Sequence, residues 1–138
     1  MVYNEKGALM VELIWKKEFD IGVAAIDEQH HKMVELINKL EEHTHNYNAN
    51  GVSEVLEELI AYTQYHFIAE ERYMESINYD GLEKHRKIHL SLVDEVLVYA
   101  DKKNRGVDVD SFELLLFLKE WLIDHILHED MKLSLSYK

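Results

Sequence analysis

Residues 55–74 read VLEELIAYTQYHFIAEERYM, and the spacing of their side chains is the clearest indication of the fold. One stripe of side chains recurs in this stretch every three or four residues, the spacing that puts side chains on one face of an α-helix. The stripe consists of Leu56, Leu59, Thr63, His66, Glu70 and Met74. His66 and Glu70 therefore lie one turn apart on the face that we expect to be buried. A buried imidazole or carboxylate is costly without a partner, so the helix predicts a bundle with a polar site inside it.

Three further amphipathic stretches occupy residues 25–45, residues 82–103 and the chain from residue 110 onward. The chain has no proline and only five glycines, so nothing interrupts long helices. We expect an all-α protein, an up-down-up-down four-helix bundle over residues 20–138. The helix that contains residues 55–74 is expected to span residues 53–77 and to be the second of the four. An N-terminal arm, residues 1–19, precedes it. The arm side chains expected to pack across the bundle are Leu13, Ile14, Trp15 and Phe19.

Turn signals separate these helices at residues 46–51, 78–81 and 104–106. Gly106 is a C-terminal glycine signal, and Asp110-Ser111-Phe112-Glu113 has the form of a capping box. The inward face of the fourth helix is expected to hold Phe112, Leu115, Leu118, Leu122, His125 and Ile126.

Composition narrows the class of protein. A length of 138 residues suits one domain, and a net charge of −12 argues against nucleic-acid binding, which needs a basic face. No apolar run approaches the roughly 20 residues that span a bilayer, and the first twenty residues lack the apolar core of a signal peptide. With no cysteine as well, we expect a cytoplasmic protein without a membrane partner. Met10 is an alternative start to Met1.

Seven side chains on the inward stripes are candidate metal ligands: His30, His66, Glu70, His85, His89, His125 and Asp130. A single inward histidine is more often a core residue bonded to a backbone carbonyl. Five histidines and two acids in one small core would destabilise one another without cations. The neighbours His31 and Glu71 fall on polar faces, and we expect His43, His45 and His128 at the surface or beside the site.

Imidazole and carboxylate ligands suit iron, manganese or zinc, and the lack of cysteine excludes thiolate sites. Seven ligands exceed the roughly six positions of one octahedral ion. Two ions offer about twelve, of which five imidazoles, two bridging carboxylates and one bridging oxide or hydroxide fill about eleven. One position is left for a small exogenous ligand.

Asp130 presents a geometric conflict, because it follows His125 by five residues. In an ideal helix that interval turns the two side chains about 140° apart. We therefore predict that the fourth helix is irregular or ends within residues 126–130.

The motifs Asp27-Glu28-Gln29-His30, His66-x-x-x-Glu70-Glu71, His85-x-x-x-His89 and Trp121-Leu122-x-x-His125-Ile126-x-x-x-Asp130 resemble the hemerythrin family, most closely the stand-alone bacterial hemerythrins. The resemblance extends from residue 15 to about residue 133. It implies a non-haem di-iron centre that binds O2 reversibly. One iron would take His85, His89 and His125, and the other His30 and His66. Glu70, Asp130 and an oxo or hydroxo group would bridge the two ions.

The resemblance also implies an apolar O2 pocket, expected to be lined by Met33, Phe67, Trp121, Leu122 and Ile126. Two positions depart from the family pattern. His31 stands where relatives often have lysine or arginine, and Glu129 where they are often apolar. Glu129 would make the pocket wetter if it faced inward and would change nothing if it faced solvent.

The predicted function is O2 binding by a carrier, store or supplier, with NO or small anions such as azide as further ligands, in a monomer that is not an enzyme. A sensor of O2, NO, redox state or iron that acts through a partner protein is the first alternative. A di-iron enzyme that reduces peroxide or NO is the second, and a structural zinc or manganese site is the third.

Overall fold

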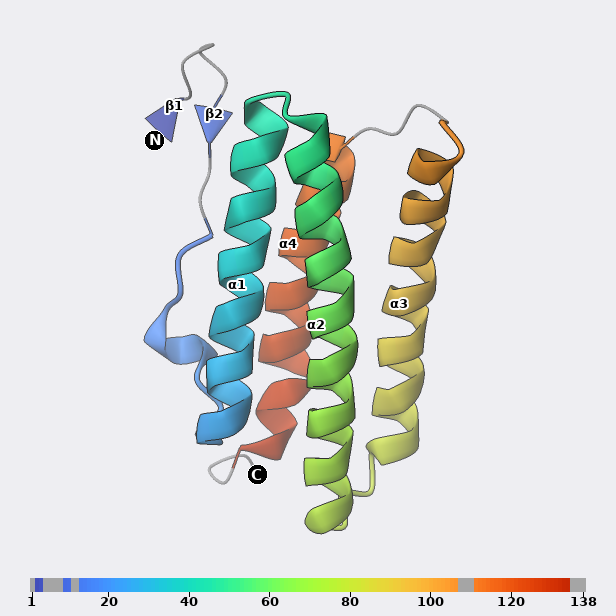
Figure 1. Ribbon diagram of the computed structural model, residues 1–138. Coiled ribbons are helices and arrows are strands. Elements are labelled where there is room, and N and C mark those ends of the chain that lie inside the picture. The colour runs from blue at the N-terminus through green and yellow to red at the C-terminus, as the bar shows by residue number, and fades with distance from the viewer. Residues whose placement is uncertain (1, 4–8, 11–12, 107–110, 135–138) are drawn as a thin grey trace.

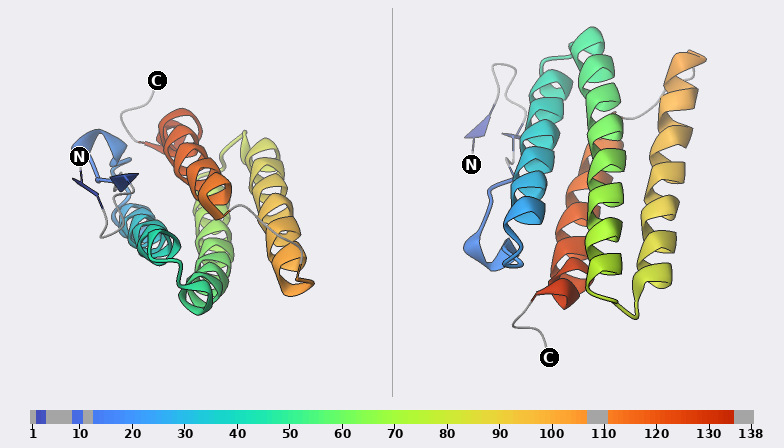
Figure 2. Two further views of the ribbon diagram at one scale, coloured as in Figure 1. Left: turned by 90° about the horizontal axis from the view of Figure 1, so that it is seen from above. Right: turned by 60° about the horizontal axis from the view of Figure 1, so that its bottom comes forward.

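The protein, described here by a computed structural model for residues 2–3, 9–10, 13–106 and 111–134, is a bundle of four long helices (Figure 1). The helices are α1 (Ala24–His45), α2 (Ala49–Ser76), α3 (Leu82–Asn104) and α4 (Ser111–His128). They alternate in direction, α1 packs against α2 and α4, and α2 also packs against α3. Seen end on, α3 lies at one edge and the N-terminal arm lies beyond α1 at the other (Figure 2). The predicted all-α, up-down-up-down architecture is confirmed.

The inward stripes form one continuous apolar core. Its buried members include the predicted Met33, Ile37, Leu40, Leu56, Leu59, Leu92, Val96, Leu115, Leu118 and Leu122. Each such side chain contributes about 1.5–3 kcal/mol on burial, so the stripes account for the packing of the bundle.

Phe112 does not join this core, although its spacing predicted that it would. Its side chain is 41% exposed. Phe112 belongs to the first turn of α4, at the end of the bundle, where its ring packs edge-on against His45 with 5.1 Å between ring centroids. Helical periodicity gives the direction of a side chain, but it does not give where the neighbouring helices stop.

The connection between α1 and α2 is shorter than predicted, because α2 begins at Ala49 instead of residue 53. The side-chain oxygen of Asn48 accepts a hydrogen bond from the backbone N–H of Gly51 at 3.0 Å and so caps the new helix. Gly51 is needed there, since a Cβ at this position would overlap the His43 ring. The predicted turn residues 49–51 thus form the first turn of α2.

Helix α3 ends at Asn104. Gly106 follows with φ of 75°, a left-handed conformation, which confirms the C-terminal glycine signal. The predicted cap at Asp110 lies outside the described residues, and α4 is described from Ser111.

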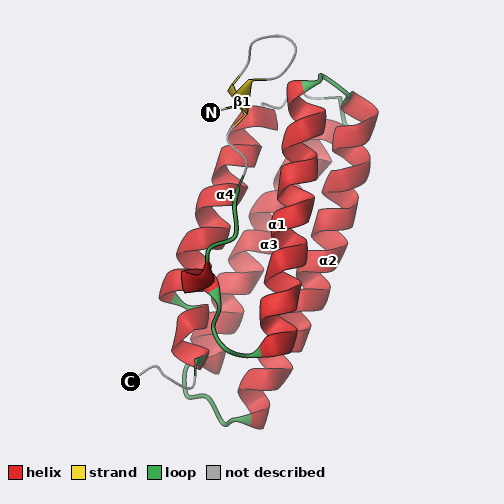
Figure 3. Cartoon of the chain, turned by 90° about the vertical axis from the view of Figure 1, so that its left-hand side faces the viewer, coloured by secondary structure: helices red, strands yellow, loops and turns green. Residues whose placement is uncertain are grey.

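The arm crosses the face formed by α1 and α4 (Figure 3). The amide of Asn38 pairs with both the backbone N–H and the carbonyl of Leu13, each at 2.9 Å. A 3-10 helix, Lys17–Phe19, follows and buries Phe19. Ile14 is 67% exposed, so its predicted packing on the bundle is wrong. Extended backbone alternates its side chains, and its neighbours Leu13 and Trp15 take the inward side.

Before this segment, two short strands, β1 (Val2–Tyr3) and β2 (Leu9–Met10), pair in antiparallel fashion. The remainder of the predicted arm, residues 1–19, lies outside the described residues.

Candidate metal centre

The predicted ligands gather at one end of the bundle, where α1 and α3 begin and α2 and α4 end. Because neighbouring helices are antiparallel, the early turns of α1 and α3 meet the late turns of α2 and α4. The side chains brought together there are His30, His66, Glu70, His85, His89, His125 and Asp130, all of them buried.

Their donor atoms form two overlapping groups, within each of which the atoms lie no more than 4.8 Å apart. One group is Glu70, His85, His89, His125 and Asp130, and the other is His30, His66, Glu70 and Asp130. The two carboxylates belong to both groups, whereas each histidine belongs to one. The cluster thus has two halves, one with three imidazoles and one with two, joined by two acids.

Each carboxylate directs one oxygen to each half. Asp130 Oδ1 lies 3.0 Å from the Nε2 atoms of both His85 and His125, and its Oδ2 lies 3.0 Å from His30 Nε2. Glu70 Oε1 lies 2.8 Å from His85 Nε2, and its Oε2 lies 3.2 Å from His66 Nε2. This arrangement is the one that two cations bridged by carboxylates require.

Asp130 reaches the cluster because α4 ends before it. The helix stops at His128, Glu129 has φ of −113°, and a 3-10 helix, Asp130–Leu133, begins directly afterwards. The prediction that the fourth helix ends within residues 126–130 is confirmed. The tighter turn carries the Asp130 side chain back under the bundle, where it is fully buried.

The electrostatics of the cluster suit a cation. Burial lowers the pKa of His30 and of His85, but the adjacent carboxylates of Asp130 and Glu70 outweigh this and raise each pKa to about 9. Burial lowers the pKa of His66. Burial raises the pKa of Asp130, but His125 and His30 outweigh this and hold it below its usual range.

Several buried atoms of the cluster also lack hydrogen bonds. Within the described chain, Glu70 Oε2, both carboxylate oxygens of Asp130 and His30 Nε2 make none. Such atoms cost free energy in a protein interior unless something else satisfies them. Nitrogen and oxygen donors that converge in this way, with two negative charges among them, fit divalent cations.

Aromatic rings cover the outer sides of the imidazoles. Phe67 stacks on His89 with 3.7 Å between centroids, and Trp121 stacks on His125 at 4.4 Å. On the opposite side, the ring of Trp15 in the arm lies 6.3 Å from that of His30. These rings keep water away from the imidazoles.

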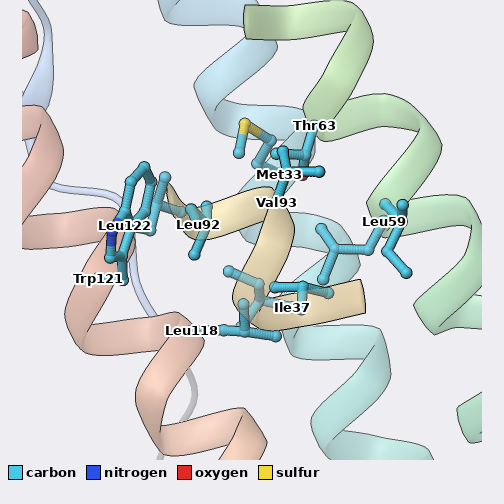
Figure 4. Close-up of a pocket in the computed structure, with 11 residues that line it drawn as sticks. Met33, Ile37, Leu59, Thr63, Leu92, Val93, Leu118, Trp121 and Leu122 are labelled. Carbon is cyan, nitrogen blue, oxygen red and sulfur yellow. The ribbon is translucent and has the colours of Figure 1, made fainter. Parts of the chain in front are cut away.

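An apolar cavity of about 30 Å³ lies in the bundle core (Figure 4), and its lining residues Met33 and Leu122 each lie one helical turn from a predicted ligand, His30 or His125. Of the five residues predicted to form an O2 pocket, Met33, Trp121 and Leu122 line it. Phe67 and Ile126 are buried but do not line it. The other lining residues are Ile37, Leu59, Ile60, Thr63, Leu92, Val93, Val96 and Leu118. The role of these residues toward O2 stays a prediction.

The remaining histidines divide differently from the prediction. His31 and His128 are exposed, as expected, and the ring of His31 stacks on Trp15 at 4.0 Å. His45 is only 5% exposed, so its placement at the surface or beside the site was wrong. It lies 3.5 Å from the buried carboxylate of Glu41, which also binds Lys119 at 2.8 Å. The ion pair of Glu41 and Lys119 lies toward the end of the bundle opposite the cluster.

Glu129 is partly exposed, and its carboxylate pairs with Lys132 at 3.3 Å. It borders an open surface pocket together with Trp121 and the predicted ligand His125. Its effect on the wetness of the site therefore stays a prediction.

Sequence reasoning missed two residues that hold the ligands in place. Gln29 Oε1 lies 2.7 Å from His66 Nδ1, and Glu71 Oε2 lies 3.0 Å from His89 Nδ1. Each is the chain neighbour of a predicted ligand, His30 or Glu70, and each belongs to one of the motifs that carry the family resemblance.

Comparison with known proteins agrees with this geometry. The family model described as "Hemerythrin HHE cation binding domain" matches residues 21–134. The chain belongs to the hemerythrin family. The resemblance drawn from the ligand spacing is therefore confirmed, and the family description names cation binding, which the cluster suits.

Hemerythrin relatives match most of the chain. A bacteriohemerythrin of Pseudomonas aeruginosa strain PAO1 is 36% identical over 121 residues, which cover 88% of this chain and 78% of that protein. A bacteriohemerythrin of Clostridium acetobutylicum is 32% identical over 123 residues, covering 85% and 95%. The myohemerythrin of Theromyzon tessulatum is 31% identical over 119 residues, covering 86% and 88%.

Among solved structures, the crystal structure of wild-type hemerythrin superposes with a TM-score of 0.84 at 27% identity, over 88% of this chain and 94% of that one. The hemerythrin fold therefore extends over almost all of the described chain. None of the helices in the described residues is long and apolar enough to cross a membrane.

Proposed function

We propose that this hemerythrin-family chain binds O2 reversibly at a non-haem di-iron centre. The observation that carries the proposal is the pair of overlapping donor groups that share Glu70 and Asp130. Two cations held side by side by shared carboxylates and separate imidazoles are what the family implies and what this donor set suits.

In this proposal His85, His89 and His125 hold one iron, and His30 and His66 hold the other. Glu70 and Asp130 serve both, with an oxo or hydroxo group between the ions. When bound, the two irons supply the electrons that O2 needs in order to bind. The half with two imidazoles has one protein donor fewer, so it is the half with room for O2.

The surrounding side chains favour binding over catalysis. Phe67, Trp121 and Trp15 cover the imidazoles with aromatic rings and limit the access of water. The adjoining cavity offers apolar space to a small uncharged molecule such as O2. A buried site beside an apolar cavity suits a small uncharged ligand that must leave unchanged.

The test is a measurement of stoichiometry on reduced, iron-loaded protein under anaerobic conditions. We expect two irons per chain, one O2 taken up per pair of irons, and the same amount of O2 released under argon. Glu70→Gln should lose this uptake, whereas the matched control Glu35→Gln, an exposed carboxylate on α1, should keep it.

Other outcomes would contradict the proposal and indicate the alternative functions. Rapid, irreversible oxidation in air would favour a sensor, and steady consumption of peroxide or NO would favour a di-iron enzyme. Zinc or manganese in the isolated protein, with no uptake of iron, would favour a structural site.

A further inference from the structure

Two imidazoles of the cluster are held from behind by side chains that the metal-binding set does not include. Gln29 Oε1 lies 2.7 Å from Nδ1 of His66, and Glu71 Oε2 lies 3.0 Å from Nδ1 of His89. In the described chain the Nδ1 atoms of His30 and His85 have no such partner. Each half of the cluster thus contains an imidazole whose Nδ1 atom is hydrogen-bonded to a side chain outside the cluster.

Both contacts fix which ring nitrogen carries the proton. A carboxylate oxygen and an amide oxygen only accept hydrogen bonds, so Nδ1–H must donate in each case. The Nε2 lone pair is then left free toward the cluster. Nε2 of His66 and Nε2 of His89 each lie 3.2 Å from a carboxylate oxygen of Glu70. The two supports therefore present the imidazoles in the form that binds a metal.

The two supports differ in charge. Gln29 is neutral, whereas Glu71 is a carboxylate whose other oxygen accepts a hydrogen bond from Arg86 Nε at 2.9 Å. Arg86 in turn bonds Glu75 and Glu83 on the surface, so it holds Glu71 in place. An anionic acceptor draws the Nδ1 proton more strongly than an amide does, which makes the opposite nitrogen a better metal donor. The negative charge also stabilises a nearby cation directly.

We propose that Glu71 and Gln29 are positioning residues that make the two halves of the centre unequal. The half of His85, His89 and His125, backed by the charged Glu71, binds its cation more tightly than the half of His30 and His66, backed by the neutral Gln29. The inference rests on the proposed two-metal centre but does not depend on O2 binding.

The test is a titration of metal-free protein with Co²⁺ against a competing chelator, with the two dissociation constants read from the visible absorption. Glu71→Gln keeps an amide oxygen at the same place but removes the charge. It should weaken the tighter site by about 10- to 100-fold, the usual effect of losing such a partner. Gln29→Glu adds the charge to the other half and should tighten the weaker site. The variant that carries both substitutions should reduce or reverse the difference between the two dissociation constants.

Glu75→Gln is the matched control, because Glu75 also pairs with Arg86 but its side chain is exposed at the surface. It should leave both dissociation constants unchanged. In iron-loaded protein, Glu71→Gln should raise the reduction potential of the centre and Gln29→Glu should lower it. A residue with a merely structural role would not shift the potential in opposite directions in the two variants.

The inference is overturned if folded Glu71→Gln and Gln29→Glu proteins both keep the wild-type dissociation constants. If Glu71→Gln fails to fold, Gln29→Glu decides by itself, since tightening of the weaker site supports the inference and no change refutes it. Wild-type protein that binds two Co²⁺ but takes up no O2 when loaded with iron would refute the proposed function alone. Wild-type protein that binds no Co²⁺ would refute both.

Discussion

Leu122 lines the apolar cavity one helical turn from the predicted ligand His125, and its truncation to alanine is the most informative single change. Leu122 is 2% exposed, lines the cavity and lies one turn before His125 on α4. Leu122→Ala removes three carbon atoms, which costs about 2.4 kcal/mol in transfer free energy. The space left behind adds to this, so we expect a total loss of about 3–5 kcal/mol in the free energy of unfolding.

The functional effect follows from water. In the wild-type protein the cavity is large enough for a water molecule, but among its lining residues in the described chain only Thr63 and Trp121 carry a polar side-chain group, so water finds few partners there. Leu122→Ala enlarges the cavity by the space of three carbon atoms, so that a second water molecule can enter and form a hydrogen bond with the first. One additional hydrogen bond is worth about 1–1.5 kcal/mol, which corresponds to roughly a tenfold change in rate. We therefore expect O2 binding capacity to be lost by autoxidation about ten times faster.

Two measurements check this prediction: the decay of the O2-loaded absorption in air, and urea unfolding. Leu36→Ala is the matched control, because Leu36 is an equally buried leucine of α1 that does not line the cavity. It should lose similar stability and keep the wild-type rate of autoxidation. Unchanged autoxidation in Leu122→Ala, or equal acceleration in both variants, would refute the argument, since the second result would report general loosening of the bundle.

Three further predictions follow from contacts elsewhere in the bundle. Lys119→Ala leaves the buried carboxylate of Glu41 without its lysine, so it should lower the free energy of unfolding in urea by about 3–5 kcal/mol. Glu41→Gln combined with Lys119→Met should recover most of this loss. A loss below about 1 kcal/mol would mean that water screens the ion pair. Asn38→Ala removes both hydrogen bonds that hold the arm at Leu13 and should speed hydrogen exchange at the Leu13 amide, and unchanged exchange would show that other contacts hold the arm. Metal-free protein should lose stability as the pH rises from 6.5 to about 9. The pKa of His30 is raised to about 9, so its protonated ring stabilises the fold fully below pH 6.5 and no longer does so above pH 9. Urea midpoints that stay constant over this range would contradict this effect of the Asp130 and Glu70 carboxylates on His30.

The cluster of candidate metal ligands could be predicted from the sequence because its geometry is mostly local. Intervals of four residues place His66 with Glu70 and His85 with His89 on one helical face, and the antiparallel order of the helices brings those faces together. The awkward interval between His125 and Asp130 was informative as well. It required α4 to end early, and α4 does end at His128.

The features that the sequence did not predict depend on contacts between distant segments. His66 and Gln29 are 37 residues apart, and His89 and Glu71 are 18 apart, so no helical period links them. His45 was misplaced for a related reason, because a position near the end of α1 suggests exposure. Lys119 of α4 supplies the partner that lets Glu41 be buried beside His45.

The most direct test of the central claim is the absorption spectrum of anaerobically reduced, iron-loaded protein, recorded before air, after air and after removal of O2 under argon. We expect a colourless protein that gains near-ultraviolet and visible charge-transfer bands in air and loses them under argon over repeated cycles. Protein that contains two irons but stays colourless in air, or that changes once to a permanent diferric spectrum, would contradict reversible O2 binding at the cluster of Glu70 and Asp130.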